Sequence, residues 1–236
     1  MAEQYIEAMH GPMLSSQCEV CRRWSGARLC PSCLARFSAP LPRCGRCGLA
    51  IGVAVPECGA CLQRSPPFAR CWCIADYVFP WNRLIIDFKF YGQPELADCL
   101  SAQLVKVVRR AAPPRVDIVV PVPLSPSRLE ERGYNQAWEI ARRVARELGI
   151  GANANLLTRV IDTPHQAALT RDERLANLRA AFVVPRHPKD PLRGRRVALV
   201  DDVMTTGATA EECARTLLRA GASAVDLWVL ARTPAP

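Results

Sequence analysis

The sequence of residues 197–209 is VALVDDVMTTGAT, and this stretch decides the fold that we expect. Residues 197–200 form a short apolar run, which is typical of a buried strand in a parallel sheet. Asp201 and Asp202 follow at the position where we expect the strand to end. After a loop of threonines and one glycine, an amphipathic helix is expected to begin with Thr209 as N-cap and Glu212 as its capping-box partner.

A strand, a polar loop and a helix start together predict a phosphate-binding site. Free N–H groups at a helix N-terminus and nearby hydroxyls donate hydrogen bonds to an anion. The substrate-binding residues expected in this stretch are Val203, Met204, Thr205, Thr206, Gly207, Ala208 and Thr209. The two carboxylates would repel a phosphate, so adjacent sugar hydroxyls are their best partners. The alternative is a strand, an acidic turn and a capped helix without a ligand, but two adjacent acids at a buried strand end are costly without a partner.

Length and charge bound the class of protein. The 236 residues are enough for one ordinary domain and a small module. We find neither an apolar run that could span a membrane nor a secretory signal pattern, so we expect a cytoplasmic protein. The formal net charge is +9, and residues 109–196 carry seventeen basic and nine acidic side chains. Such an excess suits a polyphosphate substrate or a nucleic acid.

Eight of the twelve cysteines form four Cys-x-x-Cys pairs, namely Cys18/Cys21, Cys30/Cys33, Cys44/Cys47 and Cys58/Cys61. Disulfides suit small secreted proteins, whereas this paired spacing favours two tetrahedral Zn²⁺ sites with four sulfurs each. Sequential pairing is the simplest arrangement, while interleaved pairing and iron–sulfur binding stay open. Sites made only of cysteine are closed, so we expect both metals to be structural.

The rest of the chain alternates between predicted strands and helices. We expect strands at residues 71–79, 116–122 and 224–230, and helices at residues 81–90, 94–110, 136–148 and 209–220. Arg128 and Arg132 lie in a loop after the second strand and close to a helix start, which favours an anion site. Residues 155–182 are expected to form a loop and a helix over the site.

The stretch at residues 197–209 resembles the fingerprint of the type I phosphoribosyltransferases, and all thirteen positions match. The resemblance implies an α/β fold with a mainly parallel sheet flanked by helices. It implies that Asp201 and Asp202 hold the ribose hydroxyls of phosphoribosyl diphosphate, bound with Mg²⁺, while the loop holds the 5′-phosphate. Lys89, Arg128 and Arg132 are expected to stabilise the departing diphosphate. Further substrate contacts are expected from Asn135, Gln136, Gln166 and Arg174.

The whole arrangement is similar to the ComF/GntX family, a double zinc ribbon joined to a type I phosphoribosyltransferase-like domain. The likeness covers about residues 17–232 and includes FKFYG at residues 88–92, VVPVPLSPSRLEERGYNQA at residues 119–137 and TPHQ at residues 163–166. We therefore expect a flexible N-terminus at residues 1–16, a double zinc ribbon at residues 17–66 and a phosphoribosyltransferase-like domain at residues 67–236.

The family resemblance implies a role in DNA uptake during competence, near a DNA-translocating helicase. One hypothesis is an enzyme that transfers phosphoribose to a nitrogen acceptor. The alternative is a non-catalytic module that binds single-stranded DNA or a competence helicase and retains a phosphoribosyl pocket. The sequence contains no acceptor-binding motif that would identify the second substrate.

Overall fold

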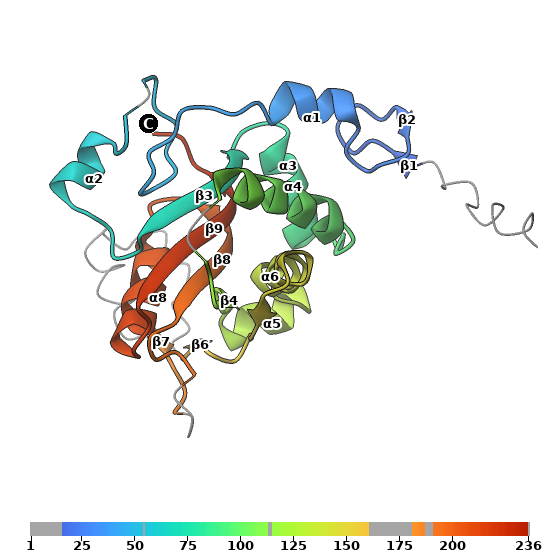
Figure 1. The fold of residues 1–236 in the computed structure, drawn as a ribbon. Coiled ribbons are helices and arrows are strands. Elements are labelled where there is room, and N and C mark those ends of the chain that lie inside the picture. Colours follow the sequence, from blue (N-terminus) through green and yellow to red (C-terminus); the bar gives the residue numbers. More distant parts are fainter. Residues whose placement is uncertain (1–15, 54, 113–114, 161–180, 187–190, 236) are drawn as a thin grey trace, which may run out of the picture. The chain divides into compact units, whose positions relative to one another are not determined.

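The computed structural model describes residues 16–53, 55–112, 115–160, 181–186 and 191–235 (Figure 1). Its contacts divide the chain into two compact units, Met1–Ala39 and Pro40–Pro236, and each is described here by itself. The second group of paired cysteines lies in the larger unit, where it shares a hydrophobic core with the sheet. We expected it to belong with the first group, and the boundary at residue 66 stays a prediction.

The smaller unit is organised around its cysteines. Its elements are β1 (Ser16–Gln17), β2 (Trp24–Ser25), which pairs antiparallel with β1, and α1 (Pro31–Phe37). Cys30 caps α1, and its sulfur accepts a hydrogen bond from the N–H of Cys33. Cys18, Cys30 and Cys33 form a small hydrophobic cluster of their own. A unit this short buries little apolar surface, so it needs a metal or another cross-link to stay folded.

The larger unit contains a five-stranded parallel sheet in the order β3-β9-β8-β4-β5. The strands are β3 (Arg70–Asp76), β4 (Ile118–Pro121), β5 (Gly151–Ala152), β8 (Arg196–Met204) and β9 (Ala224–Arg232). The central strands β8 and β9 are buried along most of their length, because both faces of the sheet are covered. The expected fold class, a mainly parallel sheet flanked by helices, is confirmed.

Helices cover both faces of this sheet (Figure 1). The helices of the larger unit are α2 (Gly59–Gln63), α3 (Trp81–Phe90), α4 (Leu96–Ala111), α5 (Pro126–Arg132), α6 (Gln136–Leu148) and α8 (Ala208–Arg219), of which α4, α6 and α8 contact the sheet. On one face α4 packs against α6, β3 and β9, whereas α8 lies with the second cysteine group on the other. A short antiparallel pair, β6 (Thr158–Arg159) and β7 (Phe182–Val183), contacts α8 through β7.

The second cysteine group also contacts the edge of the sheet. The backbone N–H of Cys71, on the edge strand β3, donates to the carbonyl of Gly45 at 3.1 Å. Arg43 forms a bridge with Ala50 and places its guanidinium 2.6 Å from the carboxylate of Asp76 at the end of β3. The cysteine-bearing segment therefore occupies hydrogen-bonding groups that an edge strand otherwise leaves free.

Two expectations about the central stretch are wrong. β8 does not end before the acidic pair but continues through Asp201 and Asp202 to Met204, because its pairing with β9 extends to Arg232. The helix begins at Ala208 with Gly207 as its N-cap, so there is no capping box. A capping box needs a serine or threonine with extended backbone at the N-cap, whereas the chain here turns through a φ of +87° at Gly207.

Candidate functional site

The acidic pair lies at the carboxyl end of β8, where two other elements meet it. The Nζ of Lys89, near the end of α3, is 2.6 Å from Oδ1 of Asp202. Both side chains are largely buried, with 16% and 12% of their surface exposed. A lysine from the FKFYG motif and a carboxylate from the central stretch therefore form one ion pair, although they lie far apart in the sequence.

Asp201 has a different environment from Asp202. Removal of water around its carboxylate and the neighbouring Asp202 charge raise the pKa of Asp201 from 3.8 to about 7, although Lys89 and Arg132 oppose this shift. Its Oδ1 accepts a hydrogen bond from the backbone N–H of Asp202 at 2.8 Å. No ion pair of Asp201 with the described residues is found, so its carboxylate can accept further hydrogen bonds.

The loop after β8 presents hydrogen-bond donors. Thr205 and Thr206 are exposed, and within the described part of the chain their backbone N–H groups and that of Gly207 have no backbone partner. The first N–H groups of α8 also have no partner inside the helix. A Cβ on Gly207 would lie 2.7 Å from Cε of Met204, which is the end of a flexible side chain and can move, so it is the positive φ of the turn that favours glycine. This geometry suits a small anion.

Arg132 and its neighbours come from the other predicted anion loop. Nη1 of Arg132 donates to Oε1 of Gln136 at 3.1 Å, and its guanidinium lies 4.8 Å from the centre of the Phe90 ring. The Nε of Arg132 and Nε2 of Gln136 are buried donors without a partner among the described residues. Buried donors are rarely left unpaired, so this region lacks an acceptor that a ligand could supply.

Other residues of this loop have structural contacts. Asn135 caps α6 by accepting from the N–H groups of Ala137 and Trp138, and its Nδ2 donates to the carbonyl of Val122 at 3.1 Å. Arg128 lies one turn before Arg132 on α5, is half-buried and forms no ion pair with the described residues. Gln166 and Arg174, which we expected to contact the substrate, lie outside the described residues.

Arg232 is a site residue that we did not find in the sequence. It ends β9 beside Met204, and its Nη1 donates to the carbonyls of Met204, at 3.1 Å, and Thr205. No motif surrounds it in the sequence, and its role depends on β9 being longer than expected. Only the register of β8 and β9 could have indicated it.

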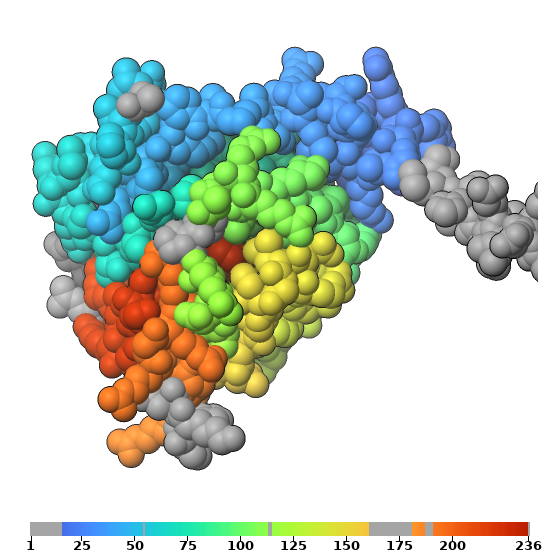
Figure 2. All heavy atoms as spheres, viewed as in Figure 1, coloured from blue at the N-terminus to red at the C-terminus, as the bar shows by residue number. Residues whose placement is uncertain are grey.

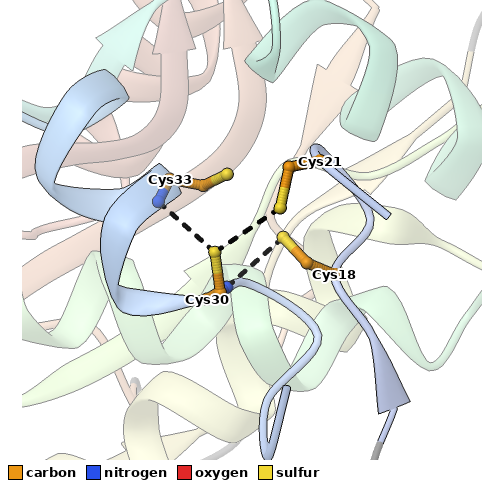
Figure 3. Close-up of side chains that lie close together, drawn as sticks. All are labelled: Cys18, Cys21, Cys30 and Cys33. Carbon is orange, nitrogen blue, oxygen red and sulfur yellow. Dashed lines mark hydrogen bonds between the residues drawn. The ribbon is translucent and has the colours of Figure 1, made fainter. Parts of the chain in front are cut away.

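The cysteines form two separate groups of four, which confirms the sequential arrangement. In each group the four sulfurs lie within 4.8 Å of one another, and the groups are Cys18, Cys21, Cys30 and Cys33, then Cys44, Cys47, Cys58 and Cys61. Figure 3 shows the sulfurs of the first group facing one another. Four sulfurs at about 2.3 Å from a tetrahedral Zn²⁺ are ~3.8 Å apart. The Cys21–Cys30 and Cys47–Cys58 sulfur distances are 3.8 Å and 3.7 Å, so both groups fit such an ion.

The first cysteine of each group has a lowered pKa, which favours its thiolate form. Burial alone would raise the pKa of Cys18, but hydrogen bonds from the backbone of Cys21, Cys30 and Val20 outweigh it and lower the pKa to about 6. Burial likewise raises the pKa of Cys44, but backbone N–H donors from its own knuckle and from Cys58 outweigh burial and lower the pKa to about 7. Metal binding requires deprotonated cysteines, so backbone geometry favours the ligand form.

A cavity of about 410 Å³ lies at the opposite end of the strands from the acidic pair. Its lining includes Arg109, Arg115 and Asp117 near the start of β4, and Trp228 of β9. In Figure 2 the red of β9 is visible at the base of this hollow, between the green end of α4 and the yellow residues after α6. The acidic pair with its loop and this cavity are therefore separate.

The parallel sheet and the acidic pair with its loop define a type I phosphoribosyltransferase-like domain. The chain also contains two four-cysteine groups that fit zinc ribbons. The sequence is 35% identical to DNA utilization protein YhgH of Salmonella typhi over 209 residues, 87% of this chain and 90% of the relative. It is 35% identical to competence protein F of Haemophilus influenzae over 208 residues, 86% and 90% of the two chains. The chain belongs to the ComF/GntX family of competence and DNA-utilization proteins.

The chain is also similar to a more distant relative and to two solved structures. Competence protein ComFC of Bacillus subtilis is 31% identical over 66% of this chain and 63% of its own. The B. subtilis glutamine phosphoribosylpyrophosphate amidotransferase aligns with a TM-score of 0.41 and 17% identity over 61% of this chain and 30% of its own. The purine phosphoribosyltransferase of Pyrococcus horikoshii aligns with a TM-score of 0.35 and 21% identity, over 57% of this chain and 71% of its own.

No family model matches the chain. Among the helices of the described residues, none is long and apolar enough to cross a membrane.

Proposed function

We propose that the protein binds phosphoribosyl diphosphate with Mg²⁺ at the carboxyl end of β8. The observation that carries the proposal is the contact between Lys89 and Asp202. Through this contact a cation lies beside two carboxylates and a loop with free N–H groups, all at the carboxyl end of β8. In open parallel sheets, ligands bind in the crevice outside the carboxyl ends of the strands.

Each part of the ligand has a chemically matched group in this arrangement. Asp201 and Asp202 would accept hydrogen bonds from the ribose 2′ and 3′ hydroxyls, while residues 203–209 would bind the 5′-phosphate through N–H and hydroxyl donors. Lys89, Arg128 and Arg132 would bind the diphosphate. Lys89 pairs with Asp202, so it is close enough to the acidic pair to bind the diphosphate of a ligand whose ribose these carboxylates hold. Gln136, with its unpaired Nε2, and Asn135 would contact the same diphosphate, and Gln166 and Arg174 are proposed to contribute further contacts.

The reaction that this site suits is displacement of diphosphate from ribose C1 by a nitrogen nucleophile. Positive charge develops on the ribose ring while the departing oxygen becomes negative. The two aspartates would stabilise the ring charge, and the lysine and arginines would stabilise the leaving group. A bound Mg²⁺ would supply further neutralisation of the diphosphate. The acceptor is not identified by the described residues.

Calorimetry tests the binding proposal directly. We expect the full-length, zinc-loaded chain to bind phosphoribosyl diphosphate in the presence of Mg²⁺ and to bind ribose 5-phosphate more weakly, because the latter lacks the diphosphate. An assay for released diphosphate across amine and nucleobase acceptors then separates turnover from binding alone. Equal affinity for ribose, without any phosphate, would show that the loop does not bind the 5′-phosphate.

The second candidate function is a non-catalytic competence module that binds single-stranded DNA or a helicase. The names of the relatives favour it, since they refer to DNA utilization and competence. The basic surplus of residues 109–196 suits a nucleic acid as well as a diphosphate.

Salt dependence tests this second candidate. Replacing Arg128 and Arg132 by glutamine should weaken single-stranded DNA binding and make the slope of log affinity against log salt shallower by about 1.4, because each phosphate contact contributes ~0.7. Arg142→Gln is the matched control, since Arg142 on α6 is engaged by Glu139 at the surface. Binding that does not respond to salt would exclude this electrostatic model.

A further inference from the structure

Arg232 connects the second cysteine group to the loop at residues 205–207. Its Nε donates to the carbonyl of Cys47 at 3.1 Å. Its Nη1 donates to the carbonyls of Met204 and Thr205, and also to that of Thr233 at 2.8 Å. One guanidinium thus holds a metal-binding knuckle on one side and the start of the loop on the other.

The identity of this residue matters. A guanidinium carries five donors in a rigid fork, so it can bind two separate backbone segments at once, whereas a lysine ammonium is one point charge on a flexible stem. Among the described residues Arg232 forms no ion pair with a carboxylate, and its hydrogen-bond acceptors there are backbone carbonyls. Its contacts therefore serve to fix the path of the backbone.

A second set of contacts joins the same two places. The sulfur of Cys71 lies 3.9 Å from the sulfur of Met204, and a Cβ at Gly48, next to the metal ligand Cys47, would lie 2.9 Å from Cys71 Sγ. The Cε of Met204 in turn fills the space beside Gly207. Close packing transmits displacements, because interiors contain few voids that could absorb them.

We propose that Arg232 is a positioning residue that makes the geometry of the phosphate loop depend on metal at the second cysteine group, Cys44, Cys47, Cys58 and Cys61. The inference rests on the proposed function only in assigning the loop to a 5′-phosphate. Coupling between two sites is reciprocal. Metal at the second group would strengthen ligand binding at the loop, and ligand at the loop would retain the metal.

The test compares Arg232→Lys with the wild type, both zinc-loaded and full-length. We expect the amide order parameters of Thr205, Thr206 and Gly207 to fall from about 0.85 to below ~0.6, while those of α6 stay unchanged. A chelator pulse followed by alkylation and peptide mapping reports which cysteines have lost metal. In the variant the second group should lose zinc about 10-fold faster, with the first group unchanged. Arg142→Met is the control for removal of a surface guanidinium.

Phosphoribosyl diphosphate with Mg²⁺ provides the reciprocal measurement. It should slow alkylation of the second group in the wild type, and this protection should disappear in Arg232→Lys. Loosening of α6 to the same extent as the loop would mean a general loss of stability of the larger unit, and would overturn the specific role of Arg232. Unchanged loop order and unchanged zinc loss in the variant would overturn the proposal. If the loop and the metal respond but the ligand protects nothing in the wild type, the coupling stands and the proposed function fails.

Discussion

Replacing Asp201 by asparagine is expected to weaken binding of phosphoribosyl diphosphate about 10- to 100-fold, the cost of losing a hydrogen bond to a charged acceptor. The side chain keeps its size and one acceptor oxygen, so the site should retain its shape. Calorimetry with Mg²⁺ measures the change. Replacing both Asp201 and Asp202 by asparagine should abolish binding.

The same substitution should increase stability at neutral and alkaline pH. The pKa of Asp201 is raised from 3.8 to about 7, so the folded protein retains a proton that the unfolded chain has released. The free energy of unfolding should therefore fall as the pH rises through this interval and level off above it. Asparagine does not ionise, so urea unfolding of the variant should lack this decline and give a higher free energy of unfolding above pH 7.

A gain in stability together with a loss of affinity would identify Asp201 as a residue kept for ligand binding at a cost to folding. Asp202→Asn is a contrasting variant, because it leaves the largely buried Lys89 without its carboxylate and should lower stability. If Asp201→Asn bound the ligand as tightly as the wild type, the ribose assignment would be wrong.

Loss of the second metal is expected to destabilise the larger unit by more than ~4 kcal/mol, because loss of a metal is one of the few changes with so large an effect. The reason is that its four cysteines belong to the same hydrophobic core as Phe68, Leu199 and Val229. The first group forms a separate small cluster, so losing its metal should unfold only that unit.

Cys61→Ser and Cys33→Ser form a matched pair for this test, since each is the last ligand of its group and is buried. Zinc analysis should give one ion per chain in either variant instead of two. Urea unfolding of the larger unit, followed by circular dichroism of its helices and sheet, should shift only in Cys61→Ser. Equal shifts in both variants would contradict the difference that the two clusters predict.

Strong local patterns made the main elements of the fold predictable. The helix expected at residues 81–90 is α3, because its apolar spacing and the glycine turn after it are unambiguous. The apolar run at residues 197–200 correctly indicated a central parallel strand. The paired cysteines likewise indicated their grouping, since two knuckles adjacent in sequence can reach one ion most easily.

The errors concern features that depend on distant partners. The extent of β8 is set by its pairing with β9, which no local signal reports. The short helix α5 was expected to be a loop, because its prolines and charged residues favour a turn. The ion pair between Lys89 and Asp202, and the contacts of Arg232, arise only when the sheet brings separate segments together.

The hydrogen bond from Cys71 to Gly45 has a consequence for solubility. An exposed edge strand can recruit strands from other molecules, and this is a common route to aggregation. With its metal in place, the second cysteine group covers part of β3 and blocks such recruitment. Metal-free protein should therefore scatter light and form oligomers through this edge, so metal supply would determine whether the chain stays monodisperse.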